Sequence, residues 1–101
     1  MAFDMFAGGV QESIGHHEEF LFSLAETDES RYPELLKVWQ FFYDDPRLSA
    51  HQAGALVHEL IELLASNGGL ASKPLASVVV RLLPFFSMAY RSQQEVTCRS
   101  D

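Results

Sequence analysis

The sequence predicts a mainly α fold: one domain with four helices and a small two-stranded ribbon formed by the N- and C-terminal segments. Three patterns support this prediction. Residues 32–64 contain two strongly apolar helical patterns that meet across a short turn, and residues 74–92 contain another. Residues 2–6 are apolar and precede Gly8-Gly9, while residues 95–99 alternate between polar and apolar. Both of these terminal patterns are typical of short strands.

The first two helices are expected from apolar spacing. Residues 13–25 should form the first helix, because Ile14, Leu21 and Leu24 lie on one helical face. Residues 33–43 should form the second, which begins with a proline that the first turn of a helix tolerates. Apolar side chains leave this second helix only a thin polar stripe, so we expect it to be buried on most of its circumference.

The turn between the second and third helices is predicted from Pro46. A residue that precedes proline is disfavoured in helical conformation, so the second helix should end at or before Asp45, which we expect to be extended. Ser49 should then cap the third helix, with Gln52 completing a capping box. Asn67-Gly68-Gly69 provides a left-handed position that ends this helix.

The fourth helix is expected to be continuous from about Pro74 to Ser92. Its polar residues recur every three or four positions, and Pro84 belongs to this polar stripe. A proline on the solvent side of a helix leaves the freed carbonyl accessible to water. We therefore predict one long helix with a kink at Pro84, and not two short ones.

Charge is distributed unevenly along the chain, whose formal net charge is −7. Residues 1–45 contain ten acids and two bases, a net charge of −8, whereas residues 46–101 contain four acids and five bases, a net charge of +1. An acidic chain repels nucleic acid and anionic lipid, and its field attracts basic partners. We therefore expect no nucleic acid and no membrane as partners, but a basic protein bound through the acidic half: Glu12, Glu18, Glu19, Glu26, Asp28, Glu29, Glu34, Asp44 and Asp45.

The expected location is the cytoplasm. No apolar run approaches the roughly 18 residues that a membrane span needs. The first residues carry no basic group and include Asp4, which disfavours a secretory signal. A single cysteine, Cys98, cannot form an internal disulfide, and this fits a reducing compartment.

A metal-binding helical protein is the alternative function. Residues 58–62 resemble the helix motif of zinc proteases, but Glu62 stands where that motif has its second histidine. Metal sites in helical bundles need inward-facing ligands from several helices, and the second and fourth helices offer almost none. We therefore predict no metal and no cofactor, while the alternative would use His16, His17, His58, Glu59 and Glu62.

The sequence predicts that the chain is not an enzyme. It contains no Gly-x-Ser-x-Gly nucleophile elbow, no phosphate-binding glycine loop and no dinucleotide fingerprint. Asp44 begins a segment like half of a calcium loop, but the required glycine and glutamate are replaced by Ser49 and Ala55. Cys98 has no neighbours that would activate its thiol.

The central block resembles the small acidic helical immunity proteins of bacterial toxin systems. The resemblance covers residues 32–64: an aromatic helix, then Tyr43-Asp44-Asp45-Pro46-Arg47-Leu48-Ser49, then a helix with Leu56-Val57-His58-Glu59-Leu60. It implies a non-catalytic protein-binding module that neutralises a cognate toxin. Homo-oligomerisation is a further expectation, because Val80, Leu83 and Phe85 lie off the main core stripe of the fourth helix.

Overall fold

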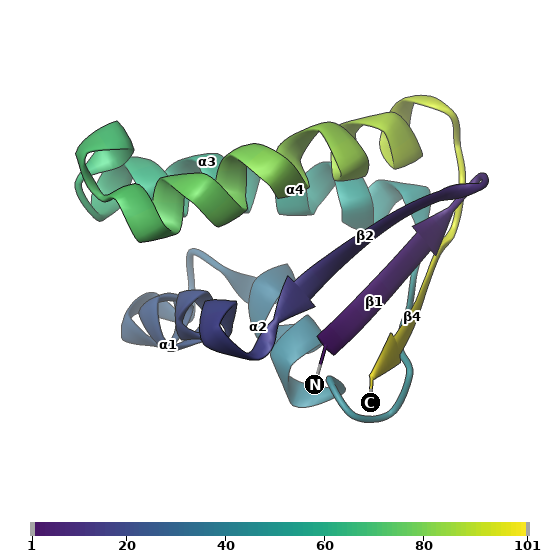
Figure 1. The fold of residues 1–101 in the computed structure, drawn as a ribbon, viewed down its shortest axis with the longest axis horizontal. Helices are drawn as coiled ribbons and strands as arrows, with labels where there is room; N and C mark the ends of the chain where they lie inside the picture. Colours follow the sequence, from purple (N-terminus) through teal and green to yellow (C-terminus); the bar gives the residue numbers. More distant parts are fainter. Residues whose placement is uncertain (1, 101) are drawn as a thin grey trace.

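The computed structural model describes residues 2–100 and shows a four-stranded sheet covered by helices (Figure 1). The strands are β1 (Ala2–Ala7), β2 (Val10–Gly15), β3 (Arg47–Leu48) and β4 (Val96–Ser100). The α-helices are α1 (Phe20–Ala25), α2 (Pro33–Gln40), α3 (Ala50–Ser66) and α4 (Lys73–Arg91). Three short 3-10 helices connect them: η1 (His16–Glu18), η2 (Glu26–Asp28) and η3 (Gly69–Ala71).

The expected mainly α fold with a two-stranded ribbon is wrong. All neighbouring strands are antiparallel, in the order β2-β1-β4-β3. The two terminal strands do pair, with Met5 opposite Cys98, but they are the inner strands of a larger sheet. β2 and the two-residue β3 extend this sheet on either side. The fold is therefore mixed α and β, with helices on one face of the sheet.

β2 replaces the first part of the helix that was predicted for residues 13–25. The chain reverses at Gly8-Gly9, where φ is +55° and +83°, and Ala7 pairs with Val10 across this two-residue turn. Two positive φ values in a two-residue loop match the twist of a hairpin, and glycine adopts them without steric cost. The strand continues to Gly15, and regular α-helix begins only at Phe20.

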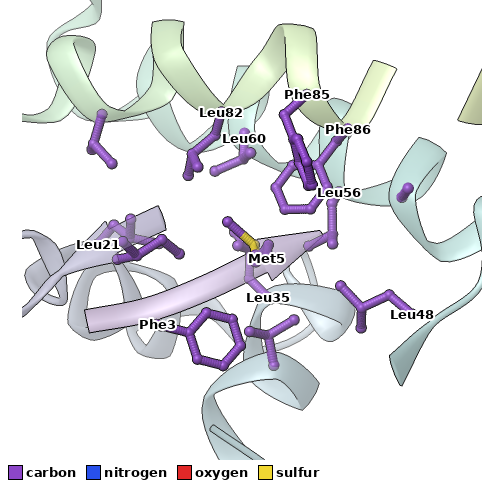
Figure 2. Close-up of a cluster of buried hydrophobic side chains, with 14 of the residues drawn as sticks. Phe3, Met5, Leu21, Leu35, Leu48, Leu56, Leu60, Leu82, Phe85 and Phe86 are labelled. Atoms are coloured by element: carbon purple, nitrogen blue, oxygen red, sulfur yellow. The ribbon is translucent and has the colours of Figure 1, made fainter. Parts of the chain in front are cut away.

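A single apolar core lies between the sheet and the helices. Alternate residues of β1, namely Phe3, Met5 and Ala7, are buried, as the period of two in a strand requires. Figure 2 shows Met5 between β1 and the α3–α4 pair, with Leu56, Leu60, Leu82, Phe85 and Phe86 on the helical side. Full burial of each such side chain contributes about 1.5–3 kcal/mol, so this layer is the main stabilising element.

α2 is shorter and less buried than predicted. It ends at Gln40, and the following turn leaves Phe41 and Tyr43 exposed. Only one aromatic residue of this turn enters the core: the ring of Phe42 stacks on Phe3 with centroids 4.3 Å apart. The expectation that aromatic residues up to Tyr43 are buried in one helix is therefore wrong at its C-terminal end.

α3 begins as the sequence predicts. The Ser49 hydroxyl accepts a hydrogen bond from the backbone N–H of Gln52 at 3.1 Å, and the Gln52 side chain accepts one from the Ser49 N–H at 2.8 Å. This capping box is confirmed. The helix ends before Gly68, which has φ +101°.

Replacing Ser49 by alanine should lower the free energy of unfolding by about 1 kcal/mol, because the N–H of Gln52 loses its acceptor. Urea unfolding of the variant measures this change. Ser30→Ala serves as control, since the Ser30 hydroxyl bonds only to an exposed carboxylate in a loop. Equal stability of both variants and the parent chain would contradict the capping role.

α4 is one continuous helix with Pro84 on its exposed side, as predicted. Val80 is exposed, as expected. Phe85 was also expected on the surface, but it is buried, with only 4% of its surface exposed. Within residues 2–100, no helix is long and apolar enough to cross a membrane.

Candidate functional site

Two of the predicted binding carboxylates, Glu12 and Glu18, are engaged by Arg81 of α4. Both terminal guanidinium nitrogens donate to the Glu18 carboxylate, at 2.9 and 2.6 Å, and Nε lies 2.9 Å from Glu12 Oε2. The same guanidinium donates to the backbone carbonyl of Ser13 at 2.8 Å. These hydrogen bonds from Arg81 hold the pKa of Glu18 below 4.5, although burial opposes them. These contacts of Arg81 therefore stabilise the fold, and they cover the free edge of β2.

Glu59, one of the alternative metal ligands, is also structural. Its side chain is buried and accepts hydrogen bonds from the backbone N–H groups of Glu34, at 3.1 Å, and Leu35, at 2.9 Å. These are N–H groups of the first turn of α2, whose own N-cap residue, Tyr32, provides no side-chain hydrogen bond. Burial raises the pKa of Glu59, while the two N–H donors partly oppose that shift.

Three further predicted carboxylates have local partners. Glu34 lies 3.8 Å from Lys37 and accepts a hydrogen bond from Gln52. Asp28 lies 3.8 Å from Arg31, which also pairs with Glu62. Glu19 lies 3.4 Å from the imidazole of His16. The side chains of Glu19 and Glu34 are only 16% and 20% exposed, whereas that of Asp28 is 42% exposed. Ion pairs near the surface contribute about 0–1 kcal/mol each, so these contacts add little to stability.

The remaining predicted carboxylates are exposed at two separate places. Glu26 and Glu29 lie in and after η2, whereas Asp44 and Asp45 follow α2. Figure 1 places the turn after α2 beside the chain termini, and α1, which η2 follows, at the left of the view. The nine predicted residues therefore differ in their surroundings: five pair with basic or polar side chains of the same chain, and four are exposed at these two places.

The turn after α2 combines exposed aromatic and acidic side chains. Tyr43 is 63% exposed and Phe41 46%, and Asp44 and Asp45 follow immediately. Sequence reasoning missed this role for the aromatic residues because it placed them in a buried helix. A signal was available: four aromatic residues within 39–43 cannot all enter one side of a helix. We call residues 41–45 the aromatic–acidic turn.

Asp45 fixes the shape of this turn. Its φ is +47°, so it is left-handed and not extended as predicted, and its carboxylate accepts a hydrogen bond from the Ser100 N–H at 3.1 Å. Asp45 borders a hollow of about 210 Å³ on the outer face of the sheet, together with Arg47 and Arg99. The rim of the turn therefore carries both signs of charge, with the acids beside the aromatic rings.

The histidines and their neighbouring carboxylates do not meet. His16 and His17 are exposed on η1, while His58 and Glu62 are exposed on α3 and Glu59 points to α2. Across residues 2–100, no group of three or more His, Cys, Asp and Glu side chains is placed to hold a metal ion. The metal-binding alternative therefore gains no support from the geometry.

Cys98 is buried in β4 with its thiol free. Burial, with a smaller effect of the nearby Asp45 charge, raises the pKa of this thiol to about 12. A cysteine nucleophile must be a thiolate, and a thiol of this pKa is almost entirely protonated at neutral pH. Cys98 is thus a core residue of the sheet.

Comparisons with protein-family models, curated proteins and solved structures give no match for this chain.

Proposed function

We propose that this chain is a non-catalytic protein-binding module that engages a basic partner through the aromatic–acidic turn. The observation that carries the proposal is the exposure of Phe41 and Tyr43 directly beside Asp44 and Asp45. Tyrosine and phenylalanine are enriched at protein interfaces, where a large ring buries apolar surface at little entropic cost. The neighbouring acids supply charge complementarity to a basic surface.

The distribution of unpaired acidic side chains supports the same proposal. Within residues 2–100, four of the seven bases lie within 4 Å of a carboxylate: Arg31, Lys37, Arg47 and Arg81. The net charge of −7 is therefore displayed mainly by exposed acids such as Glu26, Glu29 and Asp44. Such a field accelerates encounter with a basic protein, while the turn provides the short-range contacts.

The specific form of the proposal is an immunity-type role, as the resemblance of residues 32–64 implies. The partner would then be a basic toxin domain whose active surface the turn covers. A cytoplasmic location belongs to this proposal and agrees with the free, buried Cys98.

Tyr43→Ala should weaken the partner complex by at least about 2 kcal/mol, roughly thirtyfold, if Tyr43 is an anchor of the interface. The partner is first captured from the native host with the parent chain and identified by mass spectrometry. Isothermal titration calorimetry then compares its affinity for the two chains.

Leu70→Ala is the matched control, because Leu70 is a 74% exposed apolar residue on η3, outside the turn. It should leave the affinity unchanged. An affinity that Tyr43→Ala does not lower, or that Leu70→Ala lowers equally, would refute the proposed interface.

A further inference from the structure

A groove of about 470 Å³ lies between α3 and the C-terminal part of α4, apart from the aromatic–acidic turn. His51, Gly54 and His58 line it from α3, and Ser87, Tyr90 and Arg91 line it from α4. Its volume falls within the roughly 300–1,000 Å³ that is usual for small-molecule sites.

Gly54 gives the groove its shape. A Cβ atom at this position would lie 2.6 Å from Cδ1 of Tyr90, well inside contact distance, so only glycine lets the ring approach the α3 backbone this closely. Tyr90 remains 47% exposed. Its ring therefore forms an apolar wall that a ligand can still reach.

The lining of this groove is not acidic, although the chain as a whole is. Its lining contains one arginine and two histidines but no carboxylate. Among the ion pairs and hydrogen bonds of residues 2–100, none neutralises Arg91. Arg81 of the same helix, by contrast, bonds to Glu12, Glu18 and the Ser13 carbonyl. The helix dipole at the N-terminal turn of α3 attracts an anion, and the dipole at the C-terminal turn of α4 repels it by a similar amount. The charge of Arg91 therefore makes the electrostatic potential in the groove positive.

We propose that this groove binds a small amphipathic carboxylate, such as an aryl-alkyl acid. The apolar part of the ligand packs against Tyr90 and Val57, and the carboxylate accepts hydrogen bonds from Arg91 and His51. Arg91 and His51 belong to the adjacent ends of the antiparallel pair α4 and α3 (Figure 1). The rest of the lining includes the apolar Ala55 and Val57 beside the neutral polar Ser87, and this arrangement fits a ligand with one charged end and an apolar body.

The test uses 4-phenylbutyrate and its cationic counterpart 4-phenylbutylamine as probes, followed by ¹H–¹⁵N correlation spectra of the full chain. The carboxylate should shift amide signals of residues 51–58 and 87–91, with a dissociation constant on the order of 1 mM for a ligand of this size. The amine should cause no saturable shifts there. Equal binding of both probes, or no shifts up to about 20 mM carboxylate, overturns the proposal.

Arg91→Gln should weaken carboxylate binding about fivefold or more, because the ligand loses a charge-assisted hydrogen bond. Arg99→Gln is the matched control: it removes the same charge from an exposed arginine on the outer face of the sheet. An unchanged affinity in Arg91→Gln, or an equal loss in Arg99→Gln, shows that Arg91 does not bind the carboxylate. Sedimentation that reveals a dimer formed through this groove would also refute the proposal.

Discussion

Replacement of Arg81 by alanine is expected to lower the free energy of unfolding by about 2–3 kcal/mol, because Glu18 would remain as an almost buried carboxylate without its counter-charge. The change would also release Glu12 and the carbonyl of Ser13, both on β2. The hairpin edge should therefore loosen along with the global fold. Urea unfolding gives the first effect, and amide hydrogen exchange of β2 gives the second.

Two further variants separate charge from geometry. Arg81→Lys keeps the charge but cannot bond in the forked manner seen with Glu18, so it should recover only part of the loss. Arg47→Ala is the control, since Arg47 is 74% exposed and 3.9 Å from Glu95, and it should change stability by less than about 0.5 kcal/mol. If Arg81→Ala lowered the free energy of unfolding no more than this control does, the contacts of Arg81 with Glu12, Ser13 and Glu18 would not stabilise the fold.

The lowered pKa of Glu18 gives this effect a defined pH dependence. Its stabilising contribution is fully present above pH 4.5 and is lost as the pH falls through the lower pKa of the folded state. The stability difference between the parent chain and Glu18→Gln should therefore shrink on acidification below pH 4.5. A difference that grows on acidification would contradict the pairing.

Replacement of Glu59 by alanine is the second large expected effect, about 2–3 kcal/mol of lost stability. Two backbone N–H groups at the start of α2 would lose their acceptor, and at Leu35 the site is buried. Urea unfolding measures the loss. Glu62→Ala is the control on the same helix: it removes an exposed carboxylate paired with Arg31 and should cost less than about 1 kcal/mol.

The raised pKa of Glu59 predicts the opposite pH dependence to that of Glu18. The folded state holds the Glu59 proton more tightly than the unfolded state, so this group loses stabilising effect as the pH rises from 4.5 through its raised pKa. The stability of the parent chain relative to Glu59→Gln should fall over that window. A relative stability that rises there would contradict burial as the dominant influence on Glu59.

Local signals in the sequence predicted what depends on neighbours along the chain. The Ser49–Gln52 box, the left-handed glycine after α3 and the continuity of α4 through Pro84 are all fixed within a few residues. β2 was missed because helical spacing around Ile14 outweighed the Gly8-Gly9 signal for a hairpin. As an edge strand, β2 also buries only Ile14, so it shows no apolar alternation.

The tasks of the carboxylates depend on long-range contacts and could not be read from the sequence. Arg81 lies 63 positions from Glu18, and Glu59 lies 24 positions from Leu35. Periodicity places each of these residues on a face of its own element but does not say which element covers that face. The candidate binding turn was partly predictable: Asp44 and Asp45 were identified, but the adjoining exposed rings became evident only from where α2 ends.

We propose that the acids of the first half have two roles: Glu12 and Glu18 stabilise the fold, while Asp44 and Asp45 at the aromatic–acidic turn engage a basic partner. The most direct test is the association rate of the captured partner with Asp44→Lys and with Glu29→Lys, which change the charge equally at the two exposed acidic places. We expect a rate at least about tenfold lower for Asp44→Lys, a smaller effect of Glu29→Lys, and convergence of the rates at high salt. Equal rates for both variants and the parent chain at low salt would contradict the proposed role of the turn.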